Sequence, residues 1–287
     1  MLTHQPVYDP AWLDAQYNNR TLIPEHPQIF ERWRRESAHS RERSECRLDL
    51  PYGEAAGETL DVFPASREGA PVLVFIHGGW WRAFSKSDHS FIAPSFVEDG
   101  AMVVLPDYAL CPAVTIDHIA LQMARALAWT WRNAALYGGD ARRIVVAGHS
   151  AGGHLATMLL CCDWSKVDAA LPARPVQGAL SISGLYDLEP LRQTSFLNVD
   201  LHLTPGAVSR LSPALFPAPQ GPLHAVAGAL ESEEFRRQTT LIRDAWGAAA
   251  VPVCETIAGM HHLGVLHDLA DPAGRSHQLA LQLLGLR

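Results

Sequence analysis

The chain of 287 residues lacks a surplus of basic residues, because 23 lysines and arginines are outnumbered by 30 aspartates and glutamates. A protein that binds nucleic acid needs a clustered basic face. The arginines between residues 32 and 43 are interleaved with glutamates, which is typical of a solvated helix face. We therefore expect no nucleic-acid partner.

Cysteine is also scarce. The five cysteines form an odd set without C-x-x-C spacing, so neither a disulfide framework nor a structural zinc site is indicated. His261, His262 and His267 lie close together in sequence, but no cysteine or carboxylate at ligand spacing accompanies them. We expect no metal and no organic cofactor.

The chain has no apolar run as long as a membrane span, and residues 1–14 lack a basic segment followed by an apolar one. We therefore expect a cytoplasmic protein without a membrane partner. Internal repeats, low-complexity tracts and an interdomain linker are absent from the sequence as well. The length fits a single domain over residues 1–287, with residues 1–45 as a helical extension packed on the catalytic core.

Short apolar runs alternate with helical patterns along the chain. Residues 116–135 and 232–247 have apolar side chains at helical spacing, and several of the apolar runs are almost continuous, as in strands covered on both faces. This alternation predicts an α/β fold with a mostly parallel central sheet and helices on both faces. The predicted strands are residues 60–63, 72–76, 101–105, 144–147, 179–183, 223–227 and 253–257.

Gly148-His149-Ser150-Ala151-Gly152 is a G-x-S-x-G pattern between a predicted strand and a helix-forming run. In this context the serine sits on a tight turn that exposes its hydroxyl, and the glycines allow the neighbouring backbone to approach. The pattern predicts Ser150 as a nucleophile.

A second glycine-rich segment, His77-Gly78-Gly79-Trp80-Trp81, directly follows the predicted strand 72–76. Acyl transfer needs two backbone N–H groups that hold the developing oxyanion. We expect one from Ala151, after the nucleophile, and the other from Gly79 or Trp80. Both indoles, together with His77, are predicted substrate contacts, since large rigid rings beside this loop favour an aromatic ligand.

A nucleophilic serine also needs a base and an acid, which in hydrolases of this kind follow it in the order acid, then histidine. Glu231 follows the strand 223–227 and is favoured as the acid, because it must reach a histidine on the next loop of the same sheet edge. Asp187, after the preceding strand, is the alternative. His261 and His262 both follow the last strand and are candidate bases.

These segments together resemble the kynurenine formamidase (arylformamidase) family of α/β hydrolases, whose pattern H-G-G-x-W is matched by residues 77–81. The likeness covers nearly the whole chain, with matching segments in the same order. They are Tyr17-Asn18-Asn19-Arg20, Asp107-Tyr108-Ala109-Leu110-Cys111-Pro112, residues 148–154, Ser183-Gly184-Leu185-Tyr186-Asp187-Leu188, residues 231–235 and Gly259-Met260-His261-His262.

The resemblance implies an α/β-hydrolase fold with Ser150 as nucleophile, Glu231 as acid and His262 rather than His261 as base. Animal members generally carry aspartate at the position of Glu231. The implied reaction is hydrolysis of N-formyl-L-kynurenine to L-kynurenine and formate, and a homodimer is a family-level expectation. A carboxylesterase of broad specificity, acting on short-chain or aryl esters, is the alternative function, because fold and triad do not determine the leaving group.

Overall fold

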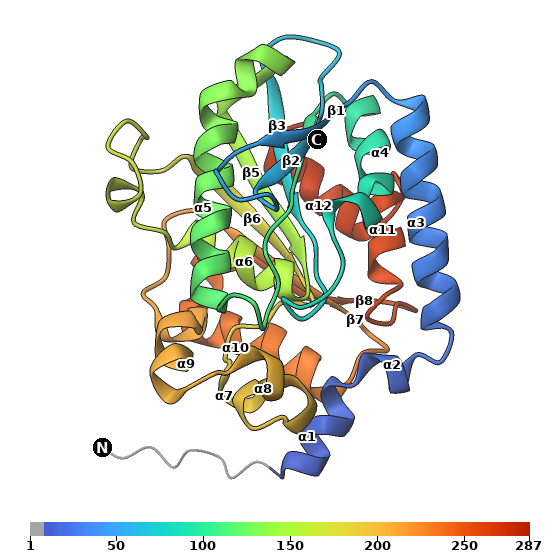
Figure 1. Cartoon of the computed structure of the whole chain (residues 1–287), viewed down its shortest axis with the longest axis vertical. Coiled ribbons are helices and arrows are strands. Elements are labelled where there is room, and N and C mark those ends of the chain that lie inside the picture. Colours follow the sequence, from blue (N-terminus) through green and yellow to red (C-terminus); the bar gives the residue numbers. More distant parts are fainter. Residues whose placement is uncertain (1–8) are drawn as a thin grey trace.

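The computed structural model describes residues 9–287, so the first eight residues of the predicted N-terminal extension lie outside the described part. An eight-stranded sheet runs through the molecule in the order β1-β2-β4-β3-β5-β6-β7-β8 (Figure 1). β1 pairs antiparallel with β2, and β2 with β4, whereas all other neighbours are parallel. The strands are β1 (Arg47–Pro51), β2 (Thr59–Phe63), β3 (Ala70–Ile76), β4 (Met102–Pro106), β5 (Gly139–His149), β6 (Val176–Ile182), β7 (Leu223–Gly228) and β8 (Val253–Ile257).

All seven predicted strands correspond to strands β2–β8, but β1 was missed. Its residues alternate charged and apolar side chains over only five positions, and most of them are exposed at the sheet edge. A short edge strand with little buried surface leaves no apolar run in the sequence.

The two predicted helices are α5 and α10. The helical pattern of residues 116–135 ends earlier as an α-helix, at Asn133, and continues as a 3₁₀ turn. α10 is interrupted at Gly247, whose φ of 79° and ψ of 166° are not helical. The α-helices are α1 (Pro10–Tyr17), α2 (Asn19–Leu22), α3 (His26–Arg43), α4 (Ala93–Glu98), α5 (Ile116–Asn133), α6 (Ala151–Leu160), α7 (Glu189–Arg192), α8 (Ser195–Leu201), α9 (Pro205–Leu211), α10 (Glu233–Ala250), α11 (Val265–Ala270) and α12 (Arg275–Leu284). The 3₁₀ helices are η1 (Lys86–Asp88), η2 (Ser90–Ile92), η3 (Ala134–Tyr137), η4 (Trp164–Lys166) and η5 (Pro213–Leu215).

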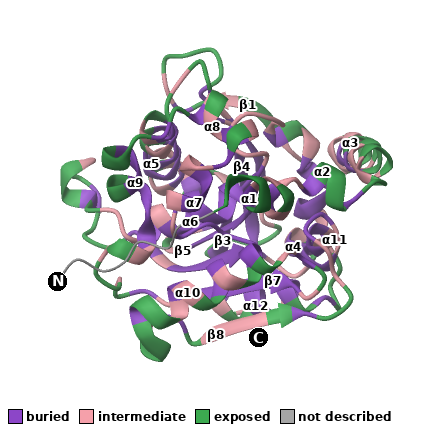
Figure 2. Cartoon of the chain, turned by 90° about the horizontal axis from the view of Figure 1, so that it is seen from below, coloured by how far each residue is buried: buried purple, intermediate pink, exposed green. Residues whose placement is uncertain are grey.

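The core lies on both faces of the sheet, as the buried residues in Figure 2 show. Side chains of a strand alternate between the faces, so Val72 and Val74 of β3 join the core beneath α5 and α6, whereas Leu73 and Phe75 join the core beneath α4 and α12. Burial on both faces explains why the central strands read as nearly continuous apolar runs.

Helices α1 and α2 and the start of α3 lie at the sheet edge at which the parallel strands end, and the rest of α3 runs alongside α4 and α11 (Figure 1). Tyr17 of α1 donates a hydrogen bond to Glu234 Oε2 of α10 at 2.7 Å, and Ser195 N of α8 donates one to Asp14 Oδ1 of α1 at 2.8 Å. Further along, Arg41 of α3 donates to the carbonyl oxygen of Ser87. We call residues 10–43 the N-terminal cover.

Candidate active site

A cavity of about 450 Å³ lies between the loops at this sheet edge and the N-terminal cover. Its volume is within the range of small-molecule sites. The loops contribute one part of the lining and the cover the other. The lining residues are Asn18, Asn19, Arg20, Phe30, Trp33, Gly78, Gly79, Trp80, Arg82, Ala83, Phe84, His89, His149, Ser150, Phe196, Asp200, His262 and Leu263.

Ser150 occupies the sharp turn between β5 and α6. Its φ of 56° and ψ of −117° lie outside the regions that non-glycine residues ordinarily adopt. The strained backbone is held by two hydrogen bonds, from Ser150 N to the Ile182 carbonyl oxygen at 2.8 Å and from His154 N to the Ser150 carbonyl oxygen at 3.0 Å. Strain that the surroundings enforce in this way is typical of functional sites.

Glycine is required on both sides of this turn. A Cβ on Gly148 would collide with the backbone of Gly152, and one on Gly152 would collide with the carbonyl oxygen of Ile76. The glycines therefore allow β5, α6 and the end of β3 to meet without a side chain between them.

Glu231 and His262 are hydrogen-bonded to each other, with 2.7 Å between Glu231 Oε2 and His262 Nδ1. The second carboxylate oxygen, Oε1, accepts hydrogen bonds from Ser183 Oγ at 2.6 Å and Gly228 N at 2.5 Å. The carboxylate is thus fixed in place, and the Glu231 side chain is completely buried. A carboxylate acceptor at Nδ1 places the proton of a neutral imidazole there and leaves Nε2 able to accept one.

Asp187 has different partners. Its Oδ1 accepts a hydrogen bond from Glu189 N at 3.0 Å at the start of α7, and its backbone is bound by the side chain of Gln238. Burial raises the pKa of the Asp187 carboxyl. Of the two acids considered from the sequence, the structure brings only Glu231 to His262.

The other histidines of this region have structural partners. His261 Nδ1 accepts hydrogen bonds from the N–H groups of Leu263 and Gly264, both at 3.2 Å, in the turn before α11. His149 Nε2 lies 2.7 Å from the carbonyl oxygen of His262, so it joins the Ser150 turn to the His262 loop. Burial and the nearby His262 ring lower the pKa of His149 well below its ordinary value, so His149 is a neutral donor.

The glycine-rich loop lies directly beside Ser150. A Cβ on Gly78 would be 2.7 Å from the His149 carbonyl oxygen and 3.2 Å from Ser150 Cβ. Gly79 has a φ of 106°, which a residue with a side chain rarely adopts, and its position is closed by Ala83 and Phe84. Ala151, as the first residue of α6, has an N–H group without a partner inside the helix.

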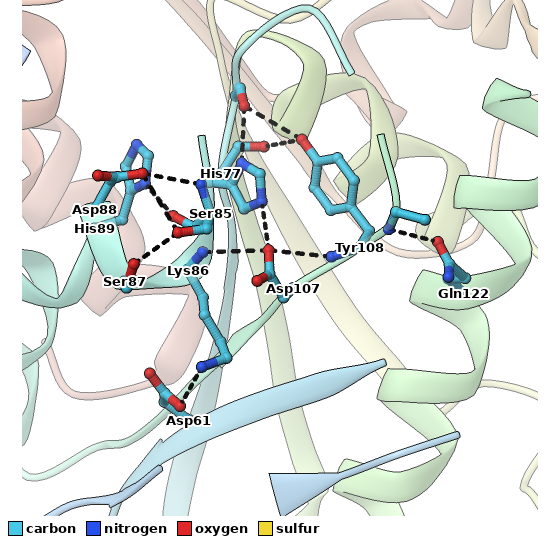
Figure 3. Close-up of polar contacts among 12 residues, drawn as sticks. Asp61, His77, Ser85, Lys86, Ser87, Asp88, His89, Asp107, Tyr108 and Gln122 are labelled. Carbon is cyan, nitrogen blue, oxygen red and sulfur yellow. Dashed lines mark hydrogen bonds and ion pairs between the residues drawn. The ribbon is translucent and has the colours of Figure 1, made fainter. Parts of the chain in front are cut away.

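His77 holds the glycine-rich loop in place through its hydrogen bonds. Its Nδ1 lies 2.8 Å from the Gly78 carbonyl oxygen and its Nε2 lies 3.2 Å from Asp107 Oδ1, while its ring stacks on Tyr108 at 4.2 Å between centroids (Figure 3). Tyr108 donates to the His77 carbonyl oxygen at 2.9 Å, and Lys86 N donates to Asp107 Oδ1 at 3.3 Å. His77, which was predicted as a substrate contact, is 1% exposed and lies outside the cavity lining, where it supports the loop.

The two tryptophans of the loop lie in different surroundings. Trp80 lines the cavity and packs edge-on against Tyr17 at 5.7 Å between ring centroids. Trp81 is fully buried against the ring of His154 at 5.1 Å and lies outside the lining. Of the two indoles predicted as substrate contacts, Trp81 thus lies in the core and Trp80 in the cavity lining.

Several lining residues were missed by the sequence reasoning. Phe30 and Trp33 of α3 form one aromatic cluster with Phe84 and His89, with Phe30 and Phe84 4.8 Å apart between ring centroids. Burial lowers the pKa of His89 to about 3, so its ring is neutral. The spacing of Phe30 and Trp33 by three residues places both on one helix face, which was the available signal, but nothing in the sequence shows what that face covers.

Two further findings concern the described residues alone. Across residues 9–287, no group of three or more histidine, cysteine, aspartate or glutamate side chains could hold a metal ion. In the same part of the chain, no helix combines the length and hydropathy needed to cross a membrane.

Comparison with known proteins adds independent evidence. The BD-FAE family model matches residues 60–195. The kynurenine formamidase of Danio rerio is 31% identical over 247 residues, which cover 83% of this chain and 82% of that protein. The esterase LipQ of Mycobacterium tuberculosis is 30% identical over 75% of this chain and 56% of its own length.

Among solved structures, that of a candidate thioesterase from Silicibacter sp. TM1040 is similar at a TM-score of 0.82 and 30% identity, covering 92% of this chain and 96% of that one. The relatives and the solved structure are hydrolases by name, and the sheet described above has the mostly parallel pairing predicted from the sequence. The chain is an enzyme that belongs to the kynurenine formamidase family of α/β hydrolases.

Proposed function

We propose that this hydrolase cleaves an aryl formamide, N-formyl-L-kynurenine, into L-kynurenine and formate. The observation that carries the proposal is the hydrogen bond of 2.7 Å between Glu231 and His262 at a cavity that Ser150 also lines. A serine on a strained turn, a histidine with a free Nε2 and a buried carboxylate are the three groups that acyl transfer requires. The formamidase relatives support the choice of leaving group.

The mechanism has two halves. In the first, His262 Nε2 takes the proton of the Ser150 hydroxyl while Oγ forms a bond to the formyl carbon. The negative oxygen of the tetrahedral intermediate accepts hydrogen bonds from the N–H of Ala151 and from the loop at Gly79 and Trp80. The C–N bond then breaks, and His262 gives its proton to the departing aryl amine.

In the second half, water attacks the formyl ester on Ser150, and His262 takes a proton from that water. The ester bond breaks, the proton returns to Ser150 Oγ, and formate leaves. Glu231 stays ionised throughout and stabilises the imidazolium that forms in each half. This stabilisation matters because the Glu231–His262 pair is almost fully buried.

A carboxylesterase is the second candidate, since the relatives and the solved structure include an esterase and a candidate thioesterase. Both functions use the same groups, so the leaving group separates them. The experiment is steady-state kinetics on N-formylkynurenine beside p-nitrophenyl acetate and butyrate, with Ser150→Ala enzyme as the control for background hydrolysis. We expect kcat/KM above about 10⁴ M⁻¹ s⁻¹ for the formamide. A kcat/KM for the formamide far below those for the esters would favour the carboxylesterase function instead.

A further inference from the structure

The cavity is lined by three charged side chains, Arg20 of the N-terminal cover, Asp200 of α8 and Arg82 of the loop after β3. Arg82 donates through Nη1 to Asp200 Oδ2 at 2.5 Å and to the Phe196 carbonyl oxygen at 2.8 Å, and its guanidinium lies 5.7 Å from the centre of the Phe196 ring. Arg20 lines the same cavity. Within residues 9–287 its guanidinium has neither an ion pair nor a hydrogen bond, so of the two cavity arginines only Arg82 is neutralised by a carboxylate.

Arg20 and Asp200 lie at the same end of the molecule. Asp14 of α1 accepts a hydrogen bond from Ser195 N at 2.8 Å and a second from Ser195 Oγ, which ties α1 to the start of α8. Figure 1 shows α1, α2 and α8 together below the sheet. Arg20 follows α1 in α2, and Asp200 lies in the last turn of α8.

Another part of the cavity lining is apolar. It is formed by Phe30, Trp33 and Phe84, whose rings belong to the aromatic cluster described above. One cavity therefore presents apolar aromatic surface, a cation without a partner and a carboxylate whose second oxygen is not used by Arg82. The protein as a whole carries a formal net charge of −7, whereas Arg20 places an unpaired positive charge at the cavity. This arrangement is complementary to an aromatic molecule that bears a positive and a negative group side by side.

We propose that Arg20 and Asp200 form a subsite for a zwitterionic α-amino acid group, in which Arg20 binds the carboxylate and Asp200 binds the ammonium. Arg82 holds Asp200 in place, and the Phe196 ring offers an additional face to the ammonium. The inference rests on the proposed function, because it concerns the part of the formamide substrate that does not react. It assigns substrate selection to a wall distinct from Ser150, Glu231 and His262.

The test uses three aryl formamides that carry different charges on the part of the molecule that does not react. N-formylkynurenine has both charges, its des-amino analogue has the carboxylate alone, and formanilide has neither. Each is measured with wild type, Arg20→Gln, Asp200→Asn and the matched control Arg34→Gln, an exposed arginine of α3 outside the cavity. Thermal unfolding of every variant checks the fold.

We expect Arg20→Gln to lower kcat/KM by about tenfold to a hundredfold on the two substrates with a carboxylate, mainly through KM, because a charge-assisted bond is lost in ground and transition state alike. Asp200→Asn should lower kcat/KM for N-formylkynurenine alone, because only this substrate has the ammonium group. Formanilide should change by less than about twofold in either variant. Arg20→Lys should recover part of the loss, since the charge remains but the planar fork does not.

Equal effects of Arg20→Gln on all three substrates, or no effect on any, would overturn the subsite and leave Arg20 as a solvated surface residue. Failure of the proposed function is seen separately, as absence of hydrolysis of all three formamides by wild type. In that case calorimetric titration of Ser150→Ala enzyme with L-kynurenine tests the subsite directly. Binding that is weakened by Arg20→Gln supports it, and binding of equal strength overturns it.

Discussion

The sheet-edge cluster of Ser150, Glu231 and His262 and the N-terminal cover line the same cavity but are built differently. In the cluster each side chain is at most 5% exposed, and the Glu231 carboxylate has three hydrogen-bond donors, counting His262. In the cover Arg20 is exposed and unpaired, and Phe30 is only half-buried. The cluster is thus held by buried hydrogen bonds, whereas the cover contributes exposed and half-buried side chains to the same cavity.

Ser150→Ala should have the largest effect on the sheet-edge cluster. We expect kcat to fall by about 10⁴-fold to 10⁶-fold with the fold retained, because covalent catalysis is lost and the elbow backbone remains. Steady-state kinetics and thermal unfolding measure the two quantities. Ser209→Ala, an exposed serine on α9, is the control and should keep full activity. Near-native turnover in Ser150→Ala would remove Ser150 from the mechanism.

The second largest effect distinguishes the two acids. Glu231→Gln should lower kcat by about 10³-fold to 10⁴-fold, since an amide at this position does not stabilise the imidazolium. Asp187→Asn should lower kcat by less than about tenfold, because its carboxylate accepts a hydrogen bond from Glu189 N and not from His262. If the Asp187 variant were the more damaged in kcat, the acid would have been assigned to the wrong residue.

Substitutions of Trp80 and Trp81 compare a residue of the cavity lining with a residue of the core. Trp81→Ala should lower the free energy of unfolding by about 3–5 kcal/mol, as is usual when a large buried ring is deleted. Trp80→Ala should affect stability less and raise KM for N-formylkynurenine instead, because Trp80 lines the cavity. Urea denaturation and kinetics on both variants check this. Similar profiles for the two variants would contradict the assignment.

The glycine loop offers a test of the oxyanion donors. Gly79→Ala should lower kcat by about a hundredfold or more, because a side chain there meets Ala83 and Phe84 and moves the N–H groups of the loop. Gly57→Ala is the matched control, since a Cβ at Gly57 has no neighbour within 4 Å. Unchanged kcat in Gly79→Ala would show that the loop donors do not hold the oxyanion.

The smallest effect concerns pH and the buried His154. Burial lowers the pKa of His154 to about 4, below the ordinary value of 6.5. The unfolded chain therefore binds a proton at pH 5 that the folded chain does not, so stability falls as pH drops from about 6.5 towards 4. Between pH 6.5 and 5 this loss is about 2 kcal/mol for one group.

His154→Gln removes that titration, so the stability loss between pH 7 and 5 should be smaller by about 2 kcal/mol than in wild type. His39→Gln, an exposed histidine of α3, should lose as much as wild type. Urea denaturation at both pH values provides the measurement. An identical pH dependence in His154→Gln and wild type would mean that His154 is not held neutral by burial.

Local patterns were sufficient for the elements that bury much apolar surface. Seven strands and the two longest helices after the cover follow from apolar runs and helical spacing, and the elbow follows from glycine spacing around Ser150. The hydrogen bonds that support the glycine-rich loop could not be predicted from local patterns, because Asp107 Oδ1 meets His77 Nε2 and Lys86 N only in the folded chain. Asp107 lies two residues after the predicted strand 101–105, which is the signal that could have marked it.

The sequence by itself determined the alternation of strands and helices and the tight turn at Ser150, because each depends on residues close together in the chain. Only the tertiary structure decided that Glu231 and not Asp187 meets His262, that Trp80 lines the cavity while Trp81 enters the core, and that Arg20 belongs to the site. These facts depend on the packing of segments far apart in the chain. Gly79, Trp80 and Trp81 all have a positive φ, of 106°, 56° and 54°, and the two neighbouring indoles end in the cavity lining and in the core. The spacing of residues in the sequence does not predict this difference.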